Sequence, residues 1–391
     1  MNTQLKKTLR RFYAFQFLSN FHFFGAVLIP FYTQWAGMSE SVALWLQTWF
    51  AIWLVIFEIP TGFIADKFGR RNSILLGNVI AAIGFLLYGS IKSLFVFGVG
   101  ELLLALAVAL VSGADEAWLY ETLKQYGRQD LMQSIHGKAR GLAMIGGGIS
   151  ALIGGYIGQY LGLNMPMMLS SLATLAVVAI VYTFPEPSNS RQSVANSAKE
   201  HIAKSFKFFT STPRIKRLTF NLISLAVVAY FVIWLYQPIL LRMKMPIGTF
   251  GYFHVIFTIS EAIIFLNFSF LSKLAGTIGN YMRLSAALTA FGFFLVAVFP
   301  NLVTLIIFLV IAGGFGLTRL EFAKSHFHHL IKSDEQRATI GSSLSFFRRS
   351  GIALANLIVG FSLAFSLHYT LLVLAAIAAA IILLPFPEQQ S

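Results

Sequence analysis

The sequence predicts an all-α membrane protein in which twelve transmembrane helices form two pseudo-symmetric six-helix bundles. Of its 391 residues, 57% are hydrophobic and 11% are charged, and the mean hydropathy is +0.73. Such a composition cannot fold around one aqueous core with a polar surface. The chain contains twelve apolar stretches of about bilayer length, and its Lys and Arg residues gather in the connections between them. Because 39 Phe residues are spread along the whole chain, neither half is a soluble domain.

Each apolar stretch is predicted to be a helix, because lipid-exposed backbone satisfies its hydrogen bonds only in helices and closed barrels. A barrel would instead show alternating strands of about ten residues. The predicted spans cover residues 12–36, 42–62, 73–91, 94–122, 138–160, 164–184, 214–239, 249–271, 282–299, 301–323, 338–364 and 366–385. The first span lacks a small-residue cleavage site after its basic N-terminus, which predicts an uncleaved helix and not a signal peptide.

The distribution of cations predicts the orientation of the helices. Of the 29 Lys and Arg residues, 23 lie in connections on the side of the termini, whereas Lys92, Arg242 and Lys244 lie on the other side. Cytoplasmic loops carry the excess of Lys and Arg. We therefore expect an integral protein of the bacterial cytoplasmic (inner) membrane with both termini cytoplasmic. The net charge of +14 is assigned to topology and anionic lipid, and nucleic-acid binding is not expected.

A long polar connection, residues 185–213, divides the chain into two predicted domains. The N-terminal six-helix bundle covers residues 1–184 and the C-terminal bundle covers residues 214–391. Within the linker, residues 198–209 carry three Lys and three Phe, which predicts a short amphipathic helix on the membrane surface; a calmodulin-like partner site is the alternative. Paired halves of this kind form alternating-access transporters with the substrate site between them.

The connection between the second and third spans carries a compact motif of charge and glycine. Residues 62–71 read Gly-Phe-Ile-Ala-Asp-Lys-Phe-Gly-Arg-Arg, and we call them the signature motif. Gly62 and Gly69 permit close helix approach and a tight turn, while Asp66 is able to cap a neighbouring helix or to pair with Arg70. The positive-inside rule accounts for Arg70 and Arg71 but not for the acid and glycines. We therefore predict that these five residues form a conformational latch.

The signature motif is similar to the loop 2-3 motif of the major facilitator superfamily. With the six-plus-six topology and the central linker, the resemblance covers essentially the whole chain. It implies two bundles around a central cavity that opens alternately to each side, and a transporter instead of an enzyme. The second half carries only an incomplete copy of the signature motif, which runs from Ser272 to Gly276 and on to Arg283 and contains no Asp.

Two further patterns of proton-coupled exporters in that family are incomplete in this chain. Where those proteins often have an Arg in span four, this sequence places Glu101. Their Gly-Pro in span five is replaced by Ser150-Ala151, ahead of a glycine-rich face that runs from Gly146 to Gly158. We expect that face to serve close helix packing, which needs small residues.

Ionisable residues inside the spans are the candidates for proton coupling, because each costs a few kcal/mol or more at the bilayer centre. Glu261 lies near the middle of span eight with no cation within several residues, and it is able to bind and release a proton. Pairing with His254, on the same helix face, is the alternative. Glu58 lies one turn before the signature motif, and Pro60 is expected to interrupt the helix there. Glu58 could then face the cavity or hold the arginines of the motif.

Asp115 and Glu116 follow a Ser112-Gly113 break in span four. Their side chains point in directions about 100° apart. We therefore expect one of them to face the cavity and the other to pair with a cation such as Arg140 or Lys138. A further acid in the same span, Glu121, is expected to pair with Lys124.

Polar and aromatic residues in the first span of each half are the candidates for a substrate cavity. Amide, imidazole and aromatic groups together suit an amphipathic organic solute better than a bare ion. Arg349, deep in span eleven beside Arg348, is able to hold a substrate carboxylate or phosphate, or to pair with an acid such as Glu321. The cavity candidates are Gln16, Asn20, His22, Tyr230, Gln237, His254 and Arg349, with Trp234 and Tyr236 either lining the cavity or packing at the interface.

No cofactor and no metal site are expected. The chain has no Cys and no Gly-x-x-x-x-Gly-Lys-Ser/Thr loop, so a proton gradient is the expected energy source. The histidines at positions 326, 328 and 329 are interpreted as an interfacial helix end and not as a metal site. The expected partners are a small-molecule substrate, membrane lipid and protons, and we expect a monomer.

These observations predict a proton-coupled secondary transporter that exports a small organic or amphipathic solute. Uptake of an anionic nutrient or a metal chelate is the alternative, motivated by Arg348 and Arg349. A membrane-embedded enzyme or sensor is the third hypothesis, although the sequence has neither clustered catalytic groups nor an appended domain.

Overall fold

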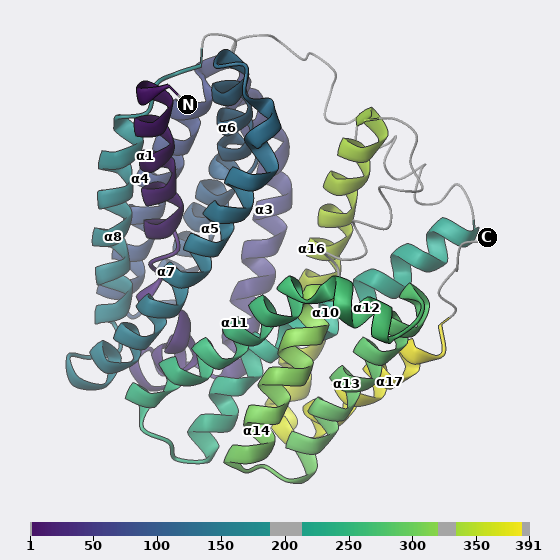
Figure 1. Cartoon of the computed structure of the whole chain (residues 1–391). Coiled ribbons are helices and arrows are strands. Elements are labelled where there is room, and N and C mark those ends of the chain that lie inside the picture. Colours follow the sequence, from purple (N-terminus) through teal and green to yellow (C-terminus); the bar gives the residue numbers. More distant parts are fainter. Residues whose placement is uncertain (1, 188–212, 320–333, 385–391) are drawn as a thin grey trace. The chain divides into compact units, whose positions relative to one another are not determined.

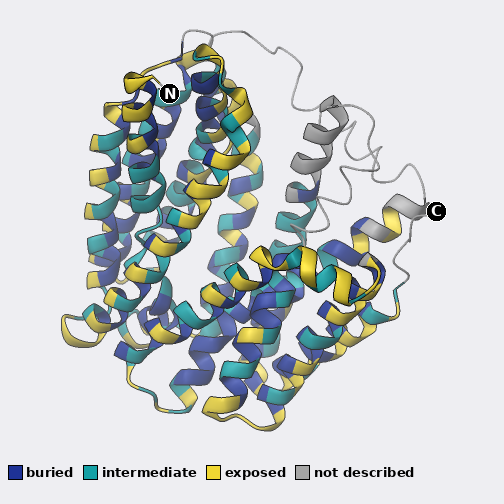
Figure 2. Ribbon diagram, in the orientation of Figure 1, coloured by how far each residue is buried: buried dark blue, intermediate teal, exposed yellow. Residues whose placement is uncertain are grey.

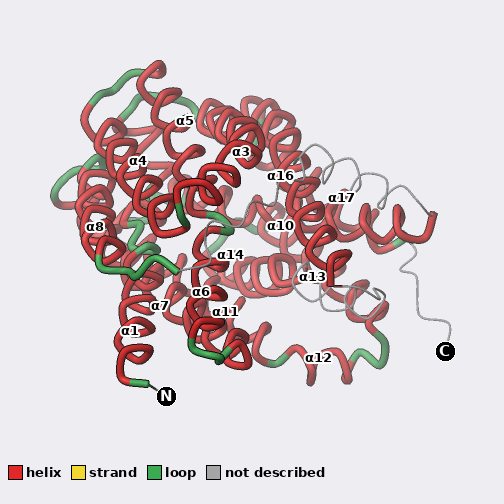
Figure 3. Tube along the Cα trace, turned by 90° about the horizontal axis from the view of Figure 1, so that it is seen from above, coloured by secondary structure: helices red, strands yellow, loops and turns green. Residues whose placement is uncertain are grey.

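The computed structural model describes residues 2–187, 213–319 and 334–384, which form helices and connecting turns without any strand (Figure 1, Figure 3). Ten of these helices are long and apolar enough to cross a membrane, or up to eleven when the bent pair Thr3–Ala26 and Leu28–Trp35 counts as one span. A shorter apolar helix, α17 (Leu367–Ile382), lies in the range predicted for the twelfth span. The predicted all-helical membrane fold is confirmed.

Contacts among the helices divide the described residues into two units. Unit 1 contains residues 2–38, 49–187 and 246–254, and unit 2 contains residues 39–48, 213–245, 255–319 and 334–384. The units follow the halves of the chain except for two short segments. The segment 246–254 belongs to unit 1, where the N–H of Gly248 donates to Gln159 Oε1 at 2.6 Å. The segment 39–48 belongs to unit 2, where both carboxylate oxygens of Glu40 accept from Arg242 at 2.9 and 3.0 Å.

Unit 1 is a bundle in which α4 packs against α5 and α8, and α1 packs against α7 (Figure 1). Its elements are α1 (Thr3–Leu18), η1 (Phe23–Ala26), α2 (Leu28–Pro30), η2 (Phe31–Trp35), most of α3 (Glu40–Phe68), α4 (Arg70–Ser90), α5 (Leu94–Val111), α6 (Ala114–Gln125), η3 (Gln129–Leu131), α7 (Met132–Tyr160) and α8 (Met165–Tyr182). We call the end of unit 1 that carries residues 62–71 the signature end, and the opposite end, with residues 91–93, the far end.

Unit 2 is a second helical bundle, in which α13 packs against α17 and α10 packs against α16. Its elements are α10 (Pro213–Arg242), most of α11 (Phe250–Leu266), α12 (Phe268–Leu274), α13 (Ile278–Val298), α14 (Leu302–Phe308), η5 (Leu309–Gly313), α16 (Asp334–Phe365) and α17. The short helix η4 (Ile247–Thr249) and the first turn of α11 belong to unit 1.

The exposed positions of the helices carry large apolar side chains. Phe95, Leu266 and Phe365 are 78%, 81% and 88% exposed, and exposed positions run along most helices (Figure 2). In an aqueous protein such surfaces would be an aggregation hazard, whereas lipid tails solvate them. The pattern therefore agrees with a protein embedded in a membrane.

The glycine face of α7 brings backbones into close contact, as predicted. A methyl group at Gly146 would overlap the carbonyl oxygen of Phe17, and one at Gly154 would overlap that of Phe23. A methyl group at Gly155 would lie 2.9 Å from the carbonyl oxygen of Gly248. Small residues allow such approach where lipid offers no hydrophobic drive for helix association.

The first predicted span, residues 12–36, is not one continuous helix. It is interrupted at residues 19–22, and farther along the chain the piece Thr3–Ala26 and the piece Leu28–Trp35 are bent by 55° relative to each other. The N–H of Phe23, just after the interruption, donates to the hydroxyl of Ser170 at 3.1 Å, and the side-chain amide of Asn20 donates to the carbonyl of Gln16 at 3.0 Å. A break inside the bundle is possible here because neighbouring protein groups replace part of the lost helical hydrogen bonding.

Pro60 does not interrupt its helix, contrary to expectation. Helix α3 continues through Pro60 to Phe68, so most of the signature motif is the last two turns of α3 and only Gly69 separates α3 from α4. A proline removes one hydrogen bond and disfavours the helix interior, but helix packing and local adjustments compensate in membrane helices. Gly62 also differs from expectation, since a methyl group there would meet no described atom within 4 Å.

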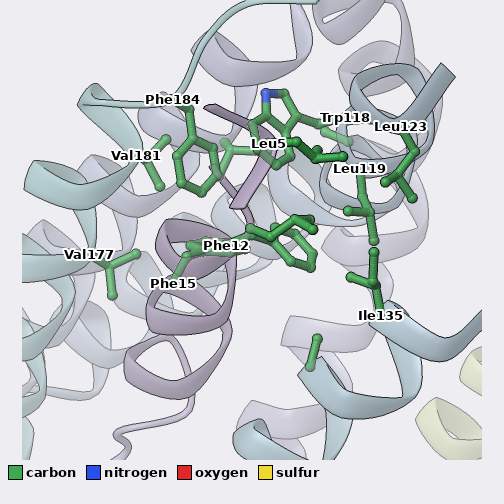
Figure 4. Packing of buried hydrophobic residues seen from close by; sticks show 14 of the residues in the cluster. Leu5, Phe12, Phe15, Trp118, Leu119, Leu123, Ile135, Val177, Val181 and Phe184 are labelled. Atoms are coloured by element: carbon green, nitrogen blue, oxygen red, sulfur yellow. The ribbon is translucent and has the colours of Figure 1, made fainter. Parts of the chain in front are cut away.

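An aromatic core fixes the signature end of unit 1 (Figure 4). The ring of Trp118 stacks on Phe184 with centroids 4.2 Å apart and on Phe12 at 5.7 Å. Its indole N–H donates to the carbonyl oxygen of Pro185 at 2.9 Å. Aromatic pairs contribute about 0.5–1.5 kcal/mol each beyond the area they bury. The core therefore ties the chain that follows α8 to α1 and α6.

The close approach at Gly154 leads to a stability prediction. Because its added methyl group would strike the backbone of Phe23, Gly154→Ala is expected to destabilise unit 1 by about 1–3 kcal/mol. The matched control is Gly141→Ala in the same helix, where a methyl group meets no described atom within 4 Å and helix propensity improves by about 1 kcal/mol. Thermal unfolding in detergent measures both variants, and equal melting temperatures would contradict the packing assignment.

Candidate functional site

A cavity of about 400 Å³ lies inside unit 1. This volume is in the range of sites for small organic molecules. The polar residues that line it are Gln16, Ser19, Asn20, His22, Asn78, Ser112, Asp115, Glu116, His136, Arg140 and Thr174. Apolar side chains such as Phe15, Phe85 and Val111 lie among them. The wall thus offers both hydrogen bonds and apolar contact to a solute.

Two helix interruptions meet at this cavity. The first span is broken at residues 19–22, and the second break lies between α5 and α6, where Gly113 adopts φ +79°. That left-handed conformation favours glycine. Helix α6 begins directly after it, with Asp115 and Glu116 in the first turn. A helix N-terminus carries partial positive charge, which stabilises carboxylates in that turn.

Both carboxylates have specific partners in the cavity wall. Gln16 Nε2 donates to Asp115 Oδ2 at 3.1 Å, and the N–H of Glu116 donates to Asp115 Oδ1 at 2.9 Å. Glu116 Oε1 lies 3.1 Å from His136 Nε2. The guanidinium of Arg140 interacts electrostatically with Asp115. Two acids, one guanidinium and one imidazole therefore meet where the backbone is broken.

This arrangement corrects two sequence-based expectations. Asp115 and Glu116 have different partners, as their angular separation required, but both line the cavity, so the expectation that only one would do so is wrong. Both reach it because the helix starts at Ala114 and its first turn faces the break. Glu121 pairs with Arg70 at 3.6 Å and not with Lys124, because it lies on α6 beside the start of α4.

The charges of the signature motif form a network within unit 1. Arg70 Nη2 lies 2.6 Å from Asp66 Oδ1, one turn earlier, and Arg70 Nε lies 3.6 Å from Glu121 Oε1. Arg71 Nη2 donates to the carbonyl oxygen of Tyr182 at 2.6 Å, and its guanidinium lies over the Tyr182 ring. The motif is thus bound to α6 and to the C-terminus of α8, where a cation complements the helix dipole.

Gly69 has two reasons to lack a side chain. Its φ is +99°, and the Glu186 carboxylate lies 2.6 Å from the position that a Cβ would occupy. Gly69 is also the residue before the first turn of α4. The acid that begins the linker therefore occupies the positive end of α4, as helix electrostatics favours.

Two other proton candidates lie outside the cavity wall. Glu58 is half-buried on α3, and Glu261 is half-buried on α11. Glu261 makes no hydrogen bond or ion pair with a described residue, so the pairing with His254 is not observed. His254 belongs to unit 1, where its imidazole lies beside Gly25, whereas Glu261 belongs to unit 2.

The remaining cavity candidates belong to unit 2. Tyr230 is half-buried on α10, and Gln237 is buried, with its amide 3.2 Å from the hydroxyl of Tyr236. Arg349 is half-buried on α16. Predictions about Glu321, the histidines at 326, 328 and 329, and the linker helix at 198–209 lie outside the described residues. Within the described residues, no group of three or more His, Asp or Glu is arranged to hold a metal ion.

Sequence reasoning missed three residues that the fold brings into these sites. His136 and Glu186 lie far along the chain from the groups they contact, Glu116 and Gly69. Glu101 was noted only as a departure from a family pattern, yet it is 3% exposed and accepts hydrogen bonds from tyrosines. A lone acid within an apolar run was the available signal for Glu101, whereas no local pattern marked the other two.

Known proteins similar to this chain include transporters of three bacteria. YajR, an inner membrane transport protein of Escherichia coli, is 28% identical over 178 residues, 44% of this chain and 36% of that protein. YfkF, an uncharacterized MFS-type transporter of Bacillus subtilis, is 39% identical over 70 residues, 18% of each chain. An uncharacterized transporter of Buchnera aphidicola is 27% identical over 154 residues, 39% of this chain and 38% of that protein. These matches span well under half the length of each relative.

Solved structures match the chain along nearly its full length. A crystal structure of the nucleoside transporter NupG aligns with a TM-score of 0.77 at 17% identity and covers 98% of each chain. A POT family transporter in complex with 5-aminolevulinic acid aligns with a TM-score of 0.74 at 12% identity, covering 96% of this chain and 95% of that one. At such identities the likeness shows the fold alone. Because residues 12–356 also match the family profile of the Major Facilitator Superfamily, the chain belongs to that superfamily and is a secondary membrane transporter, not an enzyme.

Proposed function

We propose that this transporter exports a small amphipathic organic solute in exchange for protons across a bacterial inner membrane. In this proposal the signature end faces the cytoplasm, as the cation distribution favours. The observation that carries the proposal is the pair Asp115 and Glu116, both in the wall of a cavity where apolar and polar groups alternate. Ionisable groups inside membrane bundles mark proton and substrate pathways.

Competition between a proton and the solute for the carboxylate of Asp115 would couple proton movement to solute movement. Asp115 is held by a neutral amide, Gln16, while Glu116 is held by His136. A carboxylate inside an apolar bundle is costly unless a proton or a cationic group compensates it. A proton and a positively charged solute would therefore displace one another at Asp115, which is the requirement for antiport. The acids outnumber Arg140, so a cationic or zwitterionic solute fits better than an anion.

Export is the direction favoured by the chemistry of such a solute. The apolar part of an amphipathic solute partitions into lipid without a carrier, so an energy-driven carrier for such a solute is useful chiefly for keeping its internal concentration low. Phe15, Phe85 and Val111 in the cavity wall provide the apolar contact that such a solute requires. The structural neighbours that carry nucleosides or peptides share only the fold at 12–17% identity, and the proposal takes no substrate from them.

Unit 2 contributes Glu261 to the proposed coupling. Its half-buried carboxylate lies on an apolar helix and has no ion-pair partner among the described residues. It would take a proton during the transport cycle, while Tyr230, Gln237 and Arg349 would supply solute contacts from this unit. The signature network of Asp66, Arg70 and Glu121 would act as the latch that stabilises one conformation.

Removing the carboxylate of Asp115 is expected to abolish coupling. We expect Asp115→Asn in proteoliposomes to move ethidium, a lipophilic cation, no faster than protein-free vesicles under a pH gradient, because an amide binds neither proton nor cation. Asp130→Asn is the control, since that acid is exposed and pairs with Arg128 outside the cavity. Gradient-driven ethidium transport by Asp115→Asn at the wild-type rate would contradict the proposal, and failure of the wild type to move ethidium would contradict a cationic solute.

Glu261→Gln is expected to separate exchange from proton-driven transport. The amide conserves the shape of the side chain but cannot carry a proton, so pH-gradient-driven ethidium transport should be lost. Exchange of labelled for unlabelled ethidium without a gradient should remain within about twofold of wild type, because it needs no net proton movement. Loss of both activities, in a variant that still binds ethidium, would assign Glu261 to solute movement instead of proton coupling.

The latch assignment predicts a change in rate without a change in affinity. Asp66→Asn leaves Arg70 with Glu121 at 3.6 Å as its carboxylate partner, and partly exposed pairs contribute about 0.2–1 kcal/mol. The initial transport rate should therefore change by up to about fivefold while the dissociation constant of ethidium stays constant. Lys67→Gln is the control, because that ammonium lies over the Phe63 and Phe68 rings. Equal rates for Asp66→Asn and wild type would exclude the latch.

A further inference from the structure

A second buried carboxylate lies toward the far end of unit 1, away from the cavity. Glu101 is 3% exposed on α5 and is not part of the cavity wall, which Leu104 of the same helix reaches one turn later. The hydroxyl of Tyr88 donates to Glu101 Oε1 at 2.6 Å, and that of Tyr32 donates to the same oxygen at 3.2 Å. The two hydroxyls lie 3.1 Å apart. We call these three residues the tyrosine-carboxylate cluster.

The cluster is enclosed by aromatic rings. Phe97 stacks on Tyr88 at 5.0 Å and meets Tyr32 edge-on at 6.1 Å, and Phe31 lies beside both tyrosines. A methyl group at Gly100 would lie 2.6 Å from the Tyr88 ring, so the glycine allows this ring to reach Glu101. Water is excluded by this packing, and both tyrosines are 1% exposed. A negative charge in such a shell costs several kcal/mol unless it is compensated.

The hydrogen bonds of the cluster are compatible with either an ionised or a protonated Glu101. The two phenols donate to an ionised carboxylate, and a protonated Glu101 would still accept at its carbonyl oxygen from Tyr88. At the far end, the ammonium of Lys92 lies 4.9 Å from the Trp35 ring centroid. Trp35 in turn stacks on Phe31. A proton from the far side would therefore reach Glu101 past this aromatic layer.

Tyr32 connects the cluster to the broken first span. It lies in the π-helical turn η2, the last part of the bent span whose earlier residues Gln16, Asn20 and His22 line the cavity. Such turns are frequent at functional sites. A change in the hydrogen bond between Tyr32 and Glu101 would thus act on the same span that forms the cavity wall.

We propose that Glu101, with Tyr32 and Tyr88, forms a second proton-binding site of this protein, distinct from the carboxylates of the cavity. The site goes beyond the proposed function, since proton binding here needs no assumption about the solute. Its consequence for transport does depend on the proposed proton coupling: far-end protonation would relax the first span before the cavity carboxylates exchange their proton.

Infrared spectroscopy of the detergent-solubilised full chain tests the site without any substrate. We expect a pH titration of the wild type to show a carboxylic-acid carbonyl band that disappears as pH rises. Glu101→Gln should lose one component of this band, and Tyr88→Phe should shift its midpoint upward, because the ionised form loses a donor. Tyr160→Phe is the control, since that ring is 71% exposed at the end of α7.

The outcomes distinguish this site from the proposed transport mechanism. Asp115→Asn should remove a different component of the band, so an unchanged titration in that variant alone would count against the cavity proposal and not against Glu101. A titration that is the same in wild type, Glu101→Gln and Tyr88→Phe would overturn the second site. If Glu101→Gln does not fold, the midpoint of Tyr88→Phe still decides, because a structural carboxylate of constant protonation would not respond to that change.

Discussion

A polypeptide inside a bilayer has no water to satisfy its backbone, so every break in a helix needs other protein groups as hydrogen-bond partners. Unit 1 meets this constraint at two places. The break at residues 19–22 is supported by the hydroxyl of Ser170 and the amide of Asn20, and it is pressed against the glycine face of α7. The break before α6 uses Gly113 in a left-handed conformation. The cavity lies where these two breaks meet.

The same constraint explains where the polar groups gather. A helix that starts inside the bundle offers free N–H groups and partial positive charge, which makes its first turn a favourable place for Asp115 and Glu116. Broken helices supply binding sites in many transporter folds for this reason. Glu101 is stabilised in a different way, because it lies within an unbroken helix and accepts hydrogen bonds from phenol hydroxyls of neighbouring elements.

The signature end depends on aromatic packing combined with charge. Trp118, Phe12 and Phe184 hold α1, α6 and the chain after α8 together. Arg70 and Arg71 bind acids of α3 and α6 and a carbonyl oxygen at the end of α8. The motif therefore makes contacts with several helices of unit 1 and does more than form the turn between α3 and α4. Its second glycine is required by backbone conformation and by Glu186, which no spacing in the motif could reveal.

Composition, periodicity and the signature motif were sufficient for the membrane class, the helical fold and the family resemblance, because each of these depends on local hydropathy and short motifs. Twelve spans were predicted, and the described residues contain ten helices, or up to eleven, that are long and apolar enough to cross a membrane. The glycine face of α7 and the break at Gly113 were also predictable, since small residues and left-handed positions leave local marks. Three features were not predictable from the sequence: the interruption of the first span, the continuity of α3 through Pro60, and the partners of Glu116 and Glu121. They depend on contacts between residues far apart in the chain, which only packing of the helices creates.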